Sequence, residues 1–183
     1  MTSSKDPITA ATKEHLWPYL QHIGFSKVSD RKYAREEDGI IQQLWVDANG
    51  IGGKRRTVVV LCANFVFGSV NGYMDPHGFR ICGGKRWNMS SIESAKRAMQ
   101  LIVNALRESE LAKLDELARM DAMLLALKNF PGRDWFDSYS ELIDRWNRGD
   151  GELLKLADSN RAALRLMSPN KSLNGDVAKA TRR

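Results

Sequence analysis

The stretch 57–67, TVVVLCANFVF, is the most apolar run of the chain and decides its fold. β-Branched and aromatic residues dominate it, which favours a strand. Successive side chains of a strand point to opposite faces, and both faces of this one are largely apolar. We therefore expect a central strand that is covered on both sides. Asn64 is the polar exception, and a buried amide needs hydrogen-bond partners, for which Arg80 is the candidate.

Short strand signals lie on both sides of this stretch. Glu37-Asp38-Gly39 has the composition of a hairpin turn, and a glycine-rich turn at 49–53 leads into the central strand. Turns that separate short runs of alternating side chains predict an antiparallel meander. The accompanying strands are expected at 25–28, 32–36, 40–46, 79–82 and 85–87.

Helical periodicity dominates the two ends of the chain. A helix capped by Thr9 or Thr12 is expected to run to Ile23, with a kink or a late start at Pro18. After the sheet, Ser90 and Glu93 form a capping-box pattern. Apolar stripes then predict helices from 92 to 106, from 110 to 127 with a break near 121, from 135 to 146 and from 153 to 167.

These patterns predict an α+β fold, with an antiparallel sheet of four to six strands, an N-terminal helix and a C-terminal helical half. We expect a disordered N-terminus at 1–8 and an α+β domain at 9–130. A helical hairpin at 131–167 is expected to pack on that domain, followed by a disordered basic tail at 168–183.

The layout between residues 14 and 128 resembles a family of small bacterial α+β proteins of unknown function. The glycine-rich basic turn at 49–56 departs from that family's pattern. The resemblance implies an α+β fold and no catalytic residues. The residues that carry it are Ile23-Gly24-Phe25, Tyr33, Gln42-Gln43, Asn64, Phe79-Arg80, and Trp87 ahead of the Ser90 helix.

The chain of 183 residues carries a formal net charge of +6. Half of this excess belongs to the tail, whose four cations stand against the single carboxylate of Asp176 and give it +3. The body is therefore only modestly basic, as is ordinary for a soluble domain. The four tail cations are Lys171, Lys179, Arg182 and Arg183.

Cys62 and Cys82 both fall in expected strands. Buried free thiols are favoured over a disulfide, although pairing stays open if the two strands are neighbours. The N-terminal residues lack the apolar segment of a signal peptide, and no run approaches the length of a membrane span. We therefore expect a cytoplasmic protein without a membrane contact.

Residues that carry catalytic chemistry are few and scattered. Asp75-Pro76-His77 offers a carboxylate and an imidazole, but a turn with a surface histidine is favoured because no third ligand has a recognisable spacing. Glu36-Glu37-Asp38 is interpreted as a solvated turn. No metal or cofactor is predicted. A non-enzymatic role is favoured over an enzyme whose site assembles around Asn64, His77 and Arg80.

Basic residues at strand ends are the main candidates for a binding surface. Lys54-Arg55-Arg56, Lys85-Arg86 and Arg31-Lys32 lie near aromatic residues, and such mixtures can hold phosphates and stack bases. Protection of sheet edges is the favoured alternative. The aromatic stripe Trp135, Tyr139 and Trp146 is likewise expected in a helix core. The predicted binding residues are Lys54, Arg55, Arg56, Asn64, His77, Arg80, Lys85, Arg86 and Trp87.

Two functions follow from these observations. The leading prediction is a bacterial interaction module that binds another protein, in an immunity-like or adaptor role, because a sound core without a catalytic constellation leaves the surface as the functional part. The alternative is a nucleic-acid-binding protein that uses its basic strand ends and tail. One contiguous positive face favours nucleic acid, and scattered charge favours a protein partner.

Overall fold

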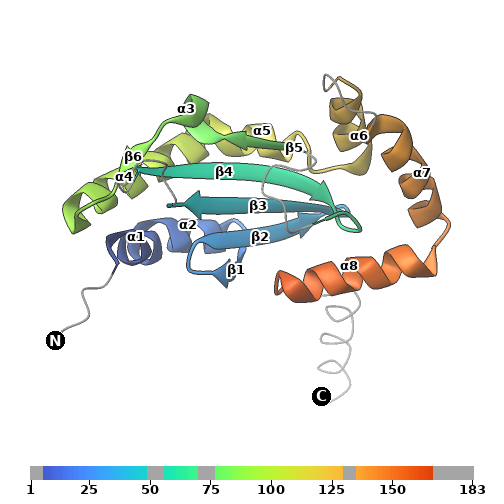
Figure 1. Cartoon of the computed structure of the whole chain (residues 1–183), viewed down its shortest axis with the longest axis horizontal. Coiled ribbons are helices and arrows are strands. Elements are labelled where there is room, and N and C mark those ends of the chain that lie inside the picture. The colour runs from blue at the N-terminus through green and yellow to red at the C-terminus, as the bar shows by residue number, and fades with distance from the viewer. Residues whose placement is uncertain (1–5, 49–55, 70–76, 130–134, 167–183) are drawn as a thin grey trace, which may run out of the picture.

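Figure 1 shows a computed structural model of the chain, in which residues 6–48, 56–69, 77–129 and 135–166 are described. Its sheet is antiparallel, with the strand order β1-β2-β3-β4-β5, and β6 also pairs with β4. The predicted α+β fold is confirmed. The strands are β1 (Ser26–Ser29), β2 (Lys32–Glu37), β3 (Ile40–Asp47), β4 (Arg56–Phe65), β5 (His77–Arg80) and β6 (Trp87–Asn88).

Strand β4 is the centre of the sheet, as its composition predicts. It pairs with β3 along one edge and with β5 and β6 along the other. Every side chain from Val59 to Phe65 is buried, so both faces of the strand are covered. Leu44 and Leu61 stand opposite each other in the register and belong to the core. Burial of this apolar run is the main local source of stability.

Two long helical segments cover one face of the sheet (Figure 1). The first joins α1 (Pro7–Ala11), the π-helical η1 (Thr12–Leu16) and α2 (Trp17–His22). The second joins α4 (Ile92–Ala105), the π-helical η2 (Leu106–Glu110) and α5 (Leu111–Asp115), and α4 packs against α1 and η1. A hydrogen bond of 2.8 Å from the buried Gln42 amide to the Leu114 carbonyl ties α5 to the sheet.

The first helix begins earlier than predicted. Asp6 is its N-cap and accepts from the Thr9 N–H at 3.2 Å, with Pro7 at the first helical position. Aspartate followed by proline is a strong helix start, so this pair prevails over Thr9 and Thr12. Ile8 is buried in the helix, which makes the prediction of disorder through residue 8 wrong. The expected kink appears as the π-helical turn just before Pro18.

Two local predictions near the end of the sheet also need correction. The capping box is formed by Ser91 and Ser94, one residue later than predicted, because the Ser94 hydroxyl reaches back to the Ser91 N–H. Cys82 lies after β5 in the tight turn α3 (Ile81–Gly84), not in a strand, and has φ +51°. Both cysteines are free thiols; Cys62 is buried and Cys82 is half-buried.

The C-terminal helices form an arc around the end of the sheet where β2 meets β3 (Figure 1). They are α6 (Met120–Lys128), α7 (Trp135–Asn147) and α8 (Gly151–Ala163). Tyr139 stacks on Phe65 at a centroid distance of 4.7 Å, and Trp146 lies 5.4 Å from Phe67. These contacts seat the α7 aromatic stripe on the sheet, although its residues stay half-buried. The side chain of Trp135 and the tail lie outside the described residues.

Candidate functional site

The outer edge of β4 gathers basic side chains from three strands. Arg80 stands opposite Val60 on β5, and Asn88 stands opposite Arg56 on β6. The turn α3 and the residues Lys85 and Arg86 separate β5 from β6, so the two short strands follow each other along the same edge. Arg80, Arg86 and Arg56 are thereby brought to one border of the sheet.

Helix α4 completes this surface from the other side of β6. A cleft of about 230 Å³ lies between β6 and α4, and Arg97 of α4 lines it together with Lys85 and Arg86. We call the five residues Arg56, Arg80, Lys85, Arg86 and Arg97 the basic edge. All five are exposed. The other residues that line the cleft are Trp87, Asn88, Ser94, Ala98 and Leu101.

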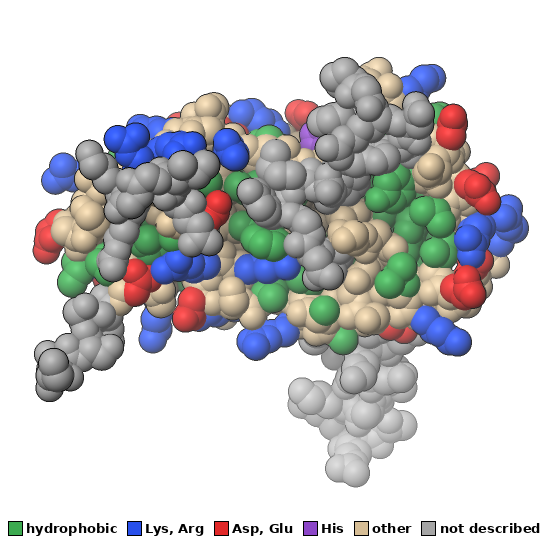
Figure 2. Space-filling model, viewed as in Figure 1, with side chains coloured by type: hydrophobic (Ala, Val, Ile, Leu, Met, Phe, Trp, Pro, Cys, Tyr) green, Lys and Arg blue, Asp and Glu red, His purple; other side chains and the backbone are tan. Residues whose placement is uncertain are grey.

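Ion pairs are absent from the basic edge within the described part of the chain. None of its five side chains forms an ion pair or a hydrogen bond with any residue that the structure describes. Many other cations are paired, as Arg161 is with Glu36 and Arg145 with Asp150. Figure 2 shows Lys and Arg side chains gathered over the region where Figure 1 places α3 and β6. The cations there form one cluster.

A buried carboxylate holds the turn that presents this edge. Glu110, which is 5% exposed, accepts a hydrogen bond of 2.9 Å from the Cys82 N–H. Its other oxygen lies 3.0 Å from the Lys113 ammonium. Burial, and then the Glu110 carboxylate, raise the pKa of the Cys82 thiol. Glu110 thus fixes a left-handed turn that Cys82 alone would adopt unfavourably, and so positions Lys85 and Arg86.

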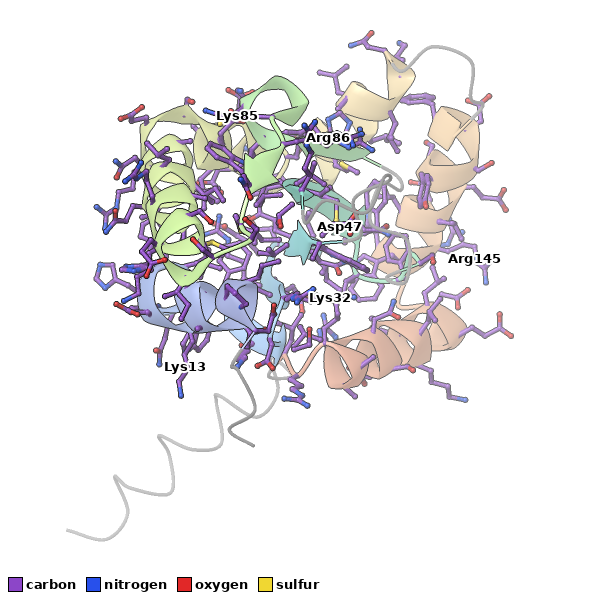
Figure 3. The ribbon with its side chains drawn as sticks, turned by 60° about the vertical axis from the view of Figure 1, so that its left-hand side comes forward. Lys13, Lys32, Asp47, Lys85, Arg86 and Arg145 are labelled. Carbon is purple, nitrogen blue, oxygen red and sulfur yellow. The ribbon has the colours of Figure 1, made fainter. Side chains whose placement is uncertain are left out.

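A mixed basic and aromatic row crosses the sheet face next to the edge. Lys32, Trp45, Val60 and Arg80 stand opposite one another on four successive strands. The Lys32 ammonium lies 4.2 Å from the centroid of the Trp45 ring, and burial lowers the pKa of Lys32. Asp47 places one carboxylate on the same face; Figure 3 shows it below Arg86 and above Lys32.

The structure separates the remaining predicted site residues. Asn64 is buried and donates from its amide to the Ser69 carbonyl, not to Arg80 as expected. His77 stands opposite Ala63, on the other face of the sheet from Asn64, and burial lowers its pKa. Trp87 is 5% exposed beneath Lys85, whose ammonium lies 4.3 Å from its ring centroid. The residues Lys54, Arg55 and Asp75 lie outside the described part of the chain.

Sequence reasoning missed Arg97. It lies on the polar face of α4, one turn after Ser94, and periodicity places it away from the core stripe. Nothing in the sequence tells which neighbour that polar face meets, because this depends on the packing of α4 against β6.

A second hollow is lined by the β2–β3 turn, which the sequence predicts to be solvated. Arg161 of α8 donates twice to the Glu36 carboxylate, each bond being 2.7 Å long, and its side chain is only 8% exposed. Glu36 is therefore an anchor for α8, and the solvated-turn interpretation is wrong for it. The hollow of about 680 Å³ beside this pair also contains the exposed Arg119–Asp121 pair. Its charges are largely satisfied within the protein.

The described residues hold neither a metal site nor a membrane span. They contain no group of three or more His, Cys, Asp or Glu side chains placed to hold a metal ion. Their helices are too short or too polar to cross a membrane. No family model, curated protein or solved structure matches the chain. The family resemblance stays a prediction.

Proposed function

We propose that this chain is a non-enzymatic binding module whose ligand is a single-stranded nucleic acid held at the basic edge. One observation carries the proposal: four exposed cations at one border of the sheet, together with Arg97 of the adjoining α4, have no carboxylate partner among the described residues. Like charges held together repel one another unless an anion lies between them. Phosphates spaced along a strand supply such anions repeatedly.

The chemistry of the edge supports a nucleic acid over an acidic protein. Four of its five cations are arginines, whose planar guanidinium groups bind phosphate oxygens in pairs. The row that runs from Arg80 to Lys32 adds the Trp45 ring to the same face. Sheets that bind single strands use aromatic rings for base stacking and cations for the backbone. These features favour nucleic acid over the protein partner that the sequence alone suggests.

The test is fluorescence anisotropy of the full chain with labelled single-stranded RNA and DNA at two salt concentrations. The variant Arg56→Gln, Arg80→Gln, Arg86→Gln removes three cations from the edge. Each phosphate contact contributes a log–log salt slope of about −0.7 for single strands, so the slope should flatten by about two units. Over a fourfold rise in salt, the variant should lose about 20 times less affinity than the unaltered chain.

A matched control removes the same charge elsewhere. Arg148, Lys155 and Arg165 are exposed and form no ion pair among the described residues. Their joint change to glutamine should leave the salt slope nearly unchanged. Equal effects of both triple variants, or binding of the unaltered chain no tighter than about 10⁻⁴ M at physiological salt, would overturn the proposal.

Protein binding is the second candidate, and α7 is the observation that favours it. Tyr139, Leu142, Ile143 and Trp146 pack on the core but stay only half-buried, and Figure 2 shows hydrophobic side chains exposed where Figure 1 places α7. Half-covered apolar stripes are typical of interaction surfaces. A partner identified by co-purification and mass spectrometry, and lost in Ile143→Glu but kept in the edge variant, would support this candidate.

A further inference from the structure

The cleft between β6 and α4 has the lining of an anion site. Lys85, Arg86 and Arg97 bring three cations to a volume of about 230 Å³. No carboxylate is among the described residues that line it. The remaining polar lining consists of the Asn88 amide and Ser94, whose hydroxyl already donates to the Ser91 carbonyl at 3.0 Å. The cleft can therefore offer hydrogen-bond donors and positive charge from several directions.

Helix α4 adds its positive end to this cleft. The helix has 14 residues and begins at Ile92, and Ser94 of its first turn lines the cleft. Partial positive charge at a helix N-terminus favours a bound anion. The Ser91–Ser94 capping box occupies the Ser94 N–H, at 3.1 Å from the Ser91 hydroxyl. The field of the helix adds to that of the three cations.

Trp87 places an aromatic ring in the wall of the cleft. It also lines the cleft, and it is 5% exposed. Its indole N–H is buried and has no hydrogen-bond acceptor among the described residues. The Trp87 ring thus forms part of the cleft wall, and its indole resonance can report a ligand bound there.

We infer that this cleft receives one phosphate group, with Lys85 and Arg97 as its main charge partners. The inference rests on the proposed function in taking the phosphate from the bound strand. A phosphate supplies negative charge that neutralises the three cations. Its several oxygens accept hydrogen bonds from the Lys and Arg side chains. The group belongs to an internal phosphodiester, to a strand end or to free phosphate, and these sources share the same recognition chemistry.

The experiment is an NMR titration of the ¹⁵N-labelled full chain, with the Trp87 indole resonance assigned through Trp87→Phe. A nucleoside 5′-monophosphate should shift that resonance and the Ser94 amide in a saturable way, and the nucleoside alone should not. Arg97→Gln removes one charge-assisted contact, so the affinity for the monophosphate should fall by about tenfold. Lys85→Gln should act similarly, and Lys155→Gln is the matched control.

Three further ligands separate the sources. Inorganic phosphate that acts as well as the monophosphate identifies a free-phosphate site. A 5′-phosphorylated oligonucleotide that binds more tightly than its 5′-hydroxyl counterpart identifies a strand end, and equal binding identifies an internal phosphodiester. In each of these three cases, Arg97→Gln must also weaken binding of the ligand.

The two proposals fail in different ways. If neither phosphate nor an oligonucleotide shifts the Trp87 resonance, or if Arg97→Gln has no effect, the inference is wrong. The proposed function still stands in that case if Arg56, Arg80 and Arg86 carry the salt dependence. If the monophosphate binds in the cleft while no strand binds, the proposed function is wrong and the phosphate site remains.

Discussion

At the scale of single residues, Asn64 shows how one polar side chain in an apolar strand is used. Its amide donates to the Ser69 carbonyl, and its side-chain oxygen leaves no room for an added Cβ at Gly68. The Gly68 N–H bonds the Phe65 carbonyl at 2.7 Å. Asn64 thus closes the turn that ends β4, and a larger residue at Gly68 would collide with it.

We expect Asn64→Ala to destabilise the fold by about 1–3 kcal/mol, because it removes a buried hydrogen bond and leaves a void. Urea denaturation followed by circular dichroism measures this change. Asn104→Ala is the control, since Asn104 is exposed on α4 and alanine favours a helix. Equal stability of the Asn64 variant and the unaltered chain would contradict a structural role for Asn64.

At the scale of elements, α8 is held to the sheet by polar groups as well as by its buried apolar residues. Asn160 donates to the Val66 and Gly68 carbonyls, each at 2.8 Å. Arg161 bonds Glu36 on β2. These contacts join residues about a hundred positions apart, so they lock the helical arc onto the turn that Asn64 also closes.

Breaking the Arg161–Glu36 pair from one side should be costly. Glu36→Gln leaves a largely buried guanidinium with only the exposed Asp158 as a charged partner, so we expect a loss of about 2–4 kcal/mol. The double variant Glu36→Gln, Arg161→Gln should lose less than the sum of the two single changes, which denaturation of all four proteins measures. Arg119→Gln, in an exposed pair, should change stability by less than about 1 kcal/mol. Strict additivity would show that the pair does not couple α8 to β2.

At the scale of the whole molecule, the positive charge and the C-terminal helices occupy opposite ends of the sheet (Figure 1). The basic edge lies where β4 begins, and the arc of α6, α7 and α8 surrounds the end where β4 finishes. The formal charge of +6 thus gives little idea of the local field, since ion pairs satisfy many cations elsewhere. Concentration of unpaired charge at one end is what can steer an anionic ligand.

Global stability should also depend on pH through His77. Burial holds its pKa below the ordinary value of 6.5, so the unfolded chain binds more protons than the folded chain in the window just below 6.5. The free energy of unfolding should therefore fall as the pH drops from about 7 to about 5.5. His77→Gln should flatten this dependence in urea denaturation at the two pH values.

His22→Gln serves as the control for this measurement, because His22 is exposed. Asp6 does not titrate in this window. Partial burial raises its pKa, but its hydrogen bonds to Arg31 and Thr9 lower the pKa by more. Its contribution to stability is therefore lost only when the pH falls below its ordinary pKa of 3.8. An unchanged pH dependence in His77→Gln would show that other groups control stability there.

The sequence by itself determined the architecture, because hydrophobic periodicity and turn chemistry are local. The apolar run at 57–67 specified a central strand, Glu37-Asp38-Gly39 specified a hairpin, and the stripe through Ile92, Met99 and Val103 specified α4. Only the tertiary structure decided which surfaces those elements share. Arg97 meets Lys85 through the packing of α4 on β6, Glu36 is removed from solvent by an arginine 125 positions away, and Asn64 turned toward Ser69 instead of Arg80. Such pairings depend on the register of strands and the seating of helices, which are set by the whole core and leave no trace in the spacing of the residues involved.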